Sequence, residues 1–126
     1  MTSNEALKSL SANSRRFLEH LRPFNGELDE VPLHEIMRAL RVLHPVVRKD
    51  AATGLRTATE LHNMAVLARI NAINPDCPLR RDRIISSEQV ATLEQWLHLI
   101  EWTWLRILQG ASEESAFMAY TEYNSD

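Results

Sequence analysis

The stretch that decides the fold is Ser86–Gly110, SSEQVATLEQWLHLIEWTWLRILQG. Both ends carry helix signals. Ser86 can cap a helix N-terminus, Gln89 completes a capping box with it, and Gly110 suits the left-handed position that follows a helix. We therefore predict one long helix over residues 86–110. It carries every tryptophan of the chain: Trp96, Trp102 and Trp104.

Most apolar side chains of this helix fall on one side, at about 100° per residue. The predicted core-facing residues are Val90, Leu93, Trp96, Leu97, Ile100, Trp104, Ile107 and Leu108. Trp102 lies instead on the polar side, between Leu99 one turn before it and Arg106 one turn after it. Tryptophan, leucine and arginine on a wet face have the composition of interface hot spots. We therefore predict a partner-binding surface made of Leu99, Trp102, Leu105 and Arg106.

An intramolecular alternative stays open for Trp102. The first helix of the chain or its C-terminal tail could cover this indole, and the face around it would then belong to the core. The two interpretations differ in one observable, which is the exposure of the Trp102 side chain.

Two more helices are predicted before Pro45. The spacing of the leucines predicts a first helix over residues 4–22, which ends before Pro23 because a residue that precedes proline is pushed out of helical geometry. A second helix is predicted to begin near Pro32, a residue suited to the first helical position. Pro45 predicts a break at about His44.

A third helix is predicted most clearly over residues 55–73. It starts at Pro45 or at Asp50, and Gly54 weakens its first turns by about 1 kcal/mol relative to alanine. One side is lined mainly by small residues, which permits close approach of a neighbouring helix. These are Ala51, Leu55, Ala58, Leu61, Ala65, Ala68 and Ala72.

The remaining segments complete an all-α architecture. Residues 74–85 are predicted to form a connecting loop, and a short helix follows from Ser112 to about Tyr120. No strand-type alternation of useful length occurs. We therefore predict a single domain over residues 1–126, a small helical bundle of four main helices plus a short C-terminal helix.

Composition places the chain among ordinary globular proteins, with 44% hydrophobic and 25% charged residues. The charge is uneven: the formal net charge is +4 over residues 31–84 and −6 over residues 85–126. These two parts could attract each other within one chain or between two. The sequence shows no secretory signal and no membrane-spanning run, and a lone Cys77 allows no internal disulfide, so we expect a cytoplasmic protein that does not enter membranes.

Catalytic and metal-binding patterns are absent from the sequence. The five histidines are scattered and make no known ligand spacing. Cys77 has no histidine base beside it in sequence, and the three glycines are isolated, so they form no phosphate-binding loop. We therefore expect neither an enzyme, nor a metal site, nor a cofactor.

The sharpest basic cluster is Arg80, Arg81 and Arg83. With the second helix, it supports an alternative function, a nucleic-acid-binding transcriptional regulator. The long helix is a poor recognition helix, because Glu88, Glu94 and Glu101 would repel phosphate. We assign the arginines instead to steering of a protein partner.

The function predicted from these patterns is a non-catalytic protein–protein interaction module. It is expected to act as a small regulator or adaptor of the inhibitor or antiactivator type. Its partner would bind the exposed apolar face of the long helix. A homodimer is the simplest form that such a surface can build.

Overall fold

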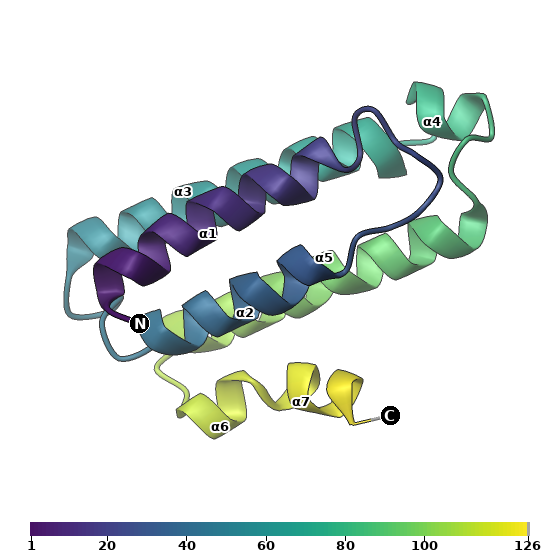
Figure 1. Ribbon diagram of the computed structural model, residues 1–126. Helices are drawn as coiled ribbons and strands as arrows, with labels where there is room; N and C mark the ends of the chain where they lie inside the picture. The colour runs from purple at the N-terminus through teal and green to yellow at the C-terminus, as the bar shows by residue number, and fades with distance from the viewer. Residues whose placement is uncertain (126) are drawn as a thin grey trace.

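The computed structural model describes residues 1–125 of the chain, and Asp126 lies outside the described residues. It confirms the predicted all-α fold, since residues 1–125 contain helices and no β-strand. Four long helices form the bundle (Figure 1): α1 (Ser3–Glu19), α2 (Val31–Leu43), α3 (Ala51–Ala68) and α5 (Ser87–Leu108). The shorter helices are α4 (Pro78–Arg81), α6 (Glu113–Ala116) and α7 (Met118–Asn124). No helix within residues 1–125 has the length and apolar composition needed to cross a membrane.

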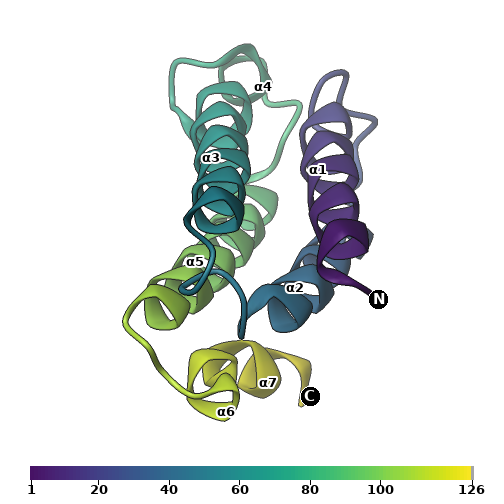
Figure 2. The same ribbon diagram turned by 90° about the vertical axis from the view of Figure 1, so that its left-hand side faces the viewer.

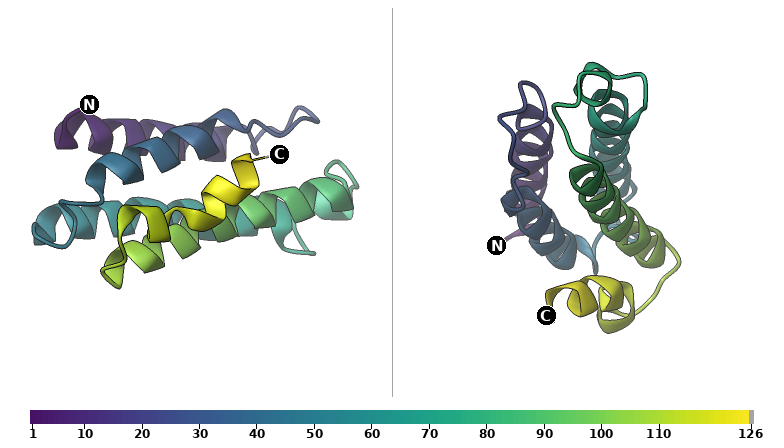
Figure 3. Two further views of the ribbon diagram at one scale, coloured as in Figure 1. Left: turned by 90° about the horizontal axis from the view of Figure 1, so that it is seen from below. Right: turned by 90° about the vertical axis from the view of Figure 1, so that its right-hand side faces the viewer.

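The four long helices form two pairs, and the C-terminal α6–α7 segment covers one side of the bundle. Figure 2 looks along it, with α1 and α2 on one side and α3 and α5 on the other. The α6–α7 segment lies across α2 and α5, as Figure 3 shows from below. The helix α5 therefore packs against α2, against α3 with the residues 69–73 that follow it, and against the α6–α7 segment.

The helix α5 has the predicted ends. The Ser86 hydroxyl accepts the Gln89 N–H at 3.0 Å, and the Gln89 side chain accepts the Ser86 N–H at 3.0 Å. This is the reciprocal capping box that the sequence predicts. Gly110 adopts a φ of 84°, the left-handed geometry that favours glycine.

The helices α1 and α2 differ from the prediction at their ends. The helix α1 stops at Glu19 rather than at Arg22, and it is capped by Thr2, which forms a capping box with Glu5. The predicted break of the second helix at His44 is confirmed, because α2 ends at the preceding residue.

The start of α3 decides between Pro45 and Asp50, the two starting points that the sequence left open for the third helix. The Asp50 carboxylate accepts the Ala52 N–H at 3.2 Å and caps the helix, so α3 begins after Asp50 and not at Pro45. Gly54 allows the chain to double back here, since a Cβ at this position would stand 2.7 Å from the Val47 carbonyl oxygen. The small-residue side is confirmed only in its second half. Ala65, Ala68 and Ala72 are buried, whereas Leu55 is 71% exposed. In the first half, Thr53 and Thr57 occupy the buried side instead.

The C-terminal end of the predicted third helix is a π-helix, η1 (Arg69–Ile73). Its wider turn is closed by a hydrogen bond of 2.8 Å from the Asn74 N–H to the Arg69 carbonyl. The predicted loop over residues 74–85 is wrong in part, because it contains α4. Pro78 stands in the first turn of that helix, where proline is tolerated.

The predicted C-terminal helix is two helices separated by a turn at Phe117. The break allows Phe117 and Tyr120 to bury their rings against the bundle, where they are 1% and 9% exposed. The guanidinium of Arg41 on α2 lies 4.4 Å from the centre of the Phe117 ring. The α6–α7 segment is therefore part of the core and no loose tail.

Candidate protein-binding groove

The helix α5 has one face in the core and one face in solvent. Its buried residues are Leu93, Trp96, Leu97, Leu99, Ile100, Thr103 and Ile107. The buried face of α5 is rotated about the helix axis relative to the predicted one, so that it includes Leu99 and Thr103. The cause is α7, which covers that side of the helix. Leu108 was expected in the core and is 47% exposed, and Trp104 is only partly buried, beside Leu61 of α3.

The solvent face of α5 forms one wall of a shallow groove of about 760 Å³. From α5 it is lined by Ala91, Glu94, Gln95, His98, Leu99, Glu101, Trp102 and Leu105, and from α7 by Ala119. From Ala91 to Leu105 the groove follows the helix for about 21 Å, at a rise of about 1.5 Å per residue. No residue of α1 lines it.

Trp102 and Leu105 are the large apolar residues of this groove that are exposed. Trp102 is 50% exposed and Leu105 is 43% exposed. Within residues 1–125 the Trp102 indole N–H makes no hydrogen bond, although the α7 segment passes beside it at Ala119. The chain therefore leaves half of this indole uncovered, and the intramolecular alternative accounts for only part of its surface.

Leu99 and Arg106 do not lie as the sequence suggested. Leu99 is 8% exposed and forms the buried edge of the groove beside α7, so its predicted place on the solvent face is wrong. The Arg106 guanidinium donates to Ser115 Oγ at 3.0 Å and to Gln109 Oε1 at 2.8 Å. These bonds tie α5 to the α6 turn, which gives Arg106 an internal role.

An ion-pair clamp borders the groove on the η1 side. The Arg69 guanidinium donates to Glu101 at 2.7 Å and to Glu94 at 3.0 Å. A second bond of 3.0 Å reaches the other Glu101 oxygen, so this contact is bidentate. The hydrogen bonds to Glu101 and then Glu94 raise the pKa of Arg69, although burial opposes the shift. The clamp balances part of the negative charge of the rim and ties both carboxylates to η1.

The predicted arginine cluster lies at the other end of α5. The Arg80 Nη1 donates to the Ile73 carbonyl at 2.7 Å and closes the end of η1, whereas Arg81 and Arg83 are exposed. The cluster precedes the first residue of α5, and Trp102 lies about 22 Å beyond that residue along the helix axis, at a rise of about 1.5 Å per residue. The structure therefore separates the predicted site residues into two groups that do not share one surface.

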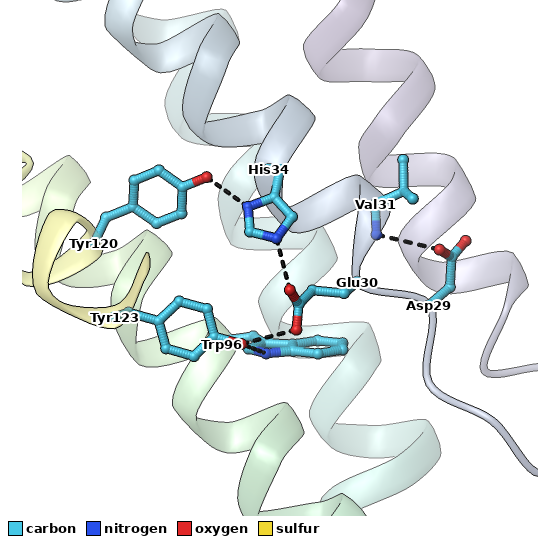
Figure 4. Close-up of polar contacts among 7 residues, drawn as sticks. All are labelled: Asp29, Glu30, Val31, His34, Trp96, Tyr120 and Tyr123. Carbon is cyan, nitrogen blue, oxygen red and sulfur yellow. Dashed lines mark hydrogen bonds and ion pairs between the residues drawn. The ribbon is translucent and has the colours of Figure 1, made fainter. Parts of the chain in front are cut away.

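A polar network that the sequence analysis missed holds α7 on the bundle (Figure 4). The Trp96 indole N–H donates to Tyr123 Oη at 3.0 Å, and the Tyr123 hydroxyl donates to Glu30 at 2.8 Å. His34 lies between Glu30, at 2.7 Å from Nε2, and the Tyr120 hydroxyl on Nδ1. In the neutral tautomer with hydrogen on Nε2, the imidazole donates to Glu30 and accepts from Tyr120.

This network has a clear electrostatic centre at Glu30. Hydrogen bonds from His34 and then Tyr123 hold the pKa of the Glu30 carboxyl below its usual range. Burial raises the pKa of the Tyr123 phenol. A carboxylate, a histidine and two tyrosines resemble an acid–base relay, but the bonds of Tyr120 to His34 and of Tyr123 to Glu30 and Trp96 join α7 to the rest of the bundle. We assign the network to the docking of α7.

A second hollow of about 440 Å³ lies at the α4 end of the bundle, lined in part by Ile70, Asn71, Phe24, Leu79 and Cys77. Cys77 is buried, with 6% of its surface exposed. No histidine lines this hollow, so the Cys77–histidine pair of a thiol nucleophile is not formed there. Among residues 1–125, no group of three or more His, Cys, Asp or Glu side chains is placed to hold a metal ion.

No protein-family model, curated protein or solved structure matches this chain.

Proposed function

We propose that the protein is a non-catalytic interaction module that binds a protein partner in the groove on α5. Its role is that of a small regulator or adaptor, of the inhibitor or antiactivator type. Self-association through the same groove is the simplest form of this binding. A lone, buried Cys77 favours action in a reducing compartment such as the cytoplasm.

The observation that carries the proposal is the exposure of Trp102 on a well-packed helix. Half of its surface is in solvent, while residues on the opposite side of the same helix are buried. Tryptophan is enriched among the residues that dominate binding energy at interfaces. Because α5 is held by its cap and by the core, little conformational entropy would be lost when this face binds.

The shape of the groove favours a helix as its occupant. It runs along α5 over about four helical turns, and its apolar positions recur at helical spacing. Apolar grooves of this kind accept the apolar face of an amphipathic helix. The clamped carboxylates on one rim leave the centre of the groove without an unpaired formal charge.

Nucleic-acid binding remains the second candidate, since Arg81 and Arg83 are exposed at the α4 end. The structure reduces the basic surface that was predicted for it. Arg80 is engaged by Ile73, and Arg41 of the second helix lies on the Phe117 ring. Binding to random duplex that weakens steeply with salt would support this candidate.

The proposed function is tested by affinity capture with three forms of the full chain: wild type, Trp102→Ala and Leu55→Ala. Leu55 is a matched control because it is also an exposed apolar residue, at 71%, on a different helix. Captured proteins are identified by mass spectrometry and then tested for binding as purified proteins. We expect at least one of them, another copy of the chain included, to bind wild type and Leu55→Ala and not Trp102→Ala. If Trp102→Ala retains every interaction of the wild type, the proposed function is wrong.

A further inference from the structure

The groove on α5 presents one continuous face of this helix. Apart from Leu99, the α5 positions that line it are 91, 94, 95, 98, 101, 102 and 105. These positions are symmetric about His98: 91 pairs with 105, 94 with 102, and 95 with 101. Every single face of an α-helix has this spacing, so a two-fold axis perpendicular to α5 at the central position, His98, lets two copies of this face pair with each other.

We infer that a second copy of this chain occupies the groove, with the two α5 helices antiparallel and the two-fold axis at His98. The inference rests on the proposed function and specifies its partner. Such an interface is isologous, because both copies use the same surface.

Side-chain size favours the antiparallel arrangement. The large apolar residues, Trp102 and Leu105, lie in the second half of the groove, and the small Ala91 lies in the first half. Antiparallel packing places Leu105 of one copy against Ala91 of the other at both ends of the interface. Parallel packing would place Trp102 against Trp102 and leave a gap between two copies of Ala91, which is a poor fit for closely packed helices.

Polar groups favour the same arrangement. The Trp102 indole N–H has no partner within residues 1–125, and Gln95 is exposed one helical turn from the two-fold axis. In the antiparallel pair, Trp102 of one copy lies level with Glu94 and next to Gln95 of the other. Either side chain offers an oxygen that can accept the indole N–H, so a donor that becomes buried finds an acceptor.

Charge favours it as well. Parallel packing would bring Glu94 to Glu94 and Glu101 to Glu101, whereas antiparallel packing brings each carboxylate level with an uncharged residue. At each end of the antiparallel pair, the acidic α6 turn of one copy, with Glu113 and Glu114, lies at the same end as the exposed Arg81 and Arg83 of the other. The uneven charge of the chain is thus complementary between two antiparallel copies.

Cysteine cross-linking tests the geometry in the full chain, with Cys77→Ala as the background. Packed helix axes lie about 8–10 Å apart, and each Cα lies about 2.3 Å from its axis. Two copies of residue 98 that face each other across the axis therefore come within disulfide range. We expect His98→Cys to form a disulfide-linked dimer under a mild oxidant. Leu55→Cys, exposed on α3, is the collision control.

We expect His98→Cys to form the disulfide at least about 10-fold faster than Leu55→Cys, because association holds the two thiols of His98→Cys together, whereas those of Leu55→Cys meet only by collision. Ala91→Cys alone should link no faster than the control, whereas a mixture of Ala91→Cys and Leu105→Cys should link quickly. The mixture serves as a second test if His98→Cys does not fold.

Rapid linking of Ala91→Cys alone would show parallel copies, which overturns the inference and leaves the proposed function standing. Linking of every variant at the control rate would show that no second copy enters the groove, which also overturns it. In that case the capture experiment with Trp102→Ala still decides whether a different protein binds there, so the two failures are distinguishable.

Discussion

Trp96 and Trp102 stand on the same helix, and the chain treats them in opposite ways. Trp96 is 2% exposed, its ring meets Phe17 edge-on, and its indole N–H donates to Tyr123. Trp102 is 50% exposed, and within residues 1–125 its N–H has no acceptor. The difference arises from the α6–α7 segment, which covers one side of α5 and stops beside the other. The face of Trp96 is covered by the chain itself, whereas the face of Trp102 is half exposed to solvent.

The largest expected effect is on Trp96. Trp96→Ala should lower the free energy of unfolding by about 3–5 kcal/mol, since a large buried ring is removed and a cavity remains. The Tyr123 hydroxyl also loses its donor. Urea unfolding followed by circular dichroism measures this loss. A urea midpoint close to that of wild type would contradict the prediction that Trp96 stabilises the folded chain much more than Trp102 does.

Trp102→Ala should have the opposite profile. We expect the free energy of association to fall by about 2–4 kcal/mol, as for a hot-spot residue, while the unfolding free energy of the monomer changes by less than about 1 kcal/mol. Light scattering over a range of concentrations gives the first value, and urea unfolding at low concentration gives the second. Loss of stability without any loss of association would contradict the role of this face.

Tyr123→Phe tests how the tail completes the Trp96 face. The change removes the hydroxyl that links the Trp96 indole to Glu30 and keeps the ring in place. We expect a loss of about 1–3 kcal/mol, because the partly buried donor of Trp96 is left unpaired. Thr121→Val is a control on the same helix, since the Thr121 hydroxyl donates to the carbonyl of Phe117, the residue just before α7, and takes no part in the network. Equal losses in the two variants would argue against the network.

The smallest effect concerns pH. Hydrogen bonds from His34 and Tyr123 hold the pKa of Glu30 below its ordinary value of 4.5, so the ionised carboxylate is favoured in the folded state. Its stabilising contribution is complete above pH 4.5 and is lost as the pH falls through the lowered value. Glu30→Gln should therefore flatten the stability profile below pH 4.5. If urea titrations give Glu30→Gln the same pH dependence of the unfolding free energy as wild type, Glu30 does not contribute to the acid sensitivity of the fold.

The sequence was sufficient wherever local chemistry decides the structure. The capping box at Ser86, the turn at Gly110, the break at His44 and the separation of Trp102 from the core sector all follow from short-range rules. These signals act within one or two helical turns, so they can be recognised from the sequence alone.

The remainder depends on which helices meet. Leu99 is buried because α7 lies over it, and Arg106 is engaged because α6 returns to it. The contact between His34 and Tyr120 joins residues 86 positions apart, and no spacing rule indicates it. The Arg69 clamp depends on such a meeting too, because it joins η1 to Glu94 and Glu101 of α5.

The comparison of the two tryptophans can be measured directly by fluorine NMR on full chain labelled with 5-fluorotryptophan, with Trp102→Phe used to assign the signal. As the protein is concentrated from the micromolar to the millimolar range, we predict that the Trp102 signal shifts and that the Trp96 signal does not. A Trp102 signal that stays unchanged over this range, in a sample that sediments as a monomer, would contradict the claim that a second copy covers this face.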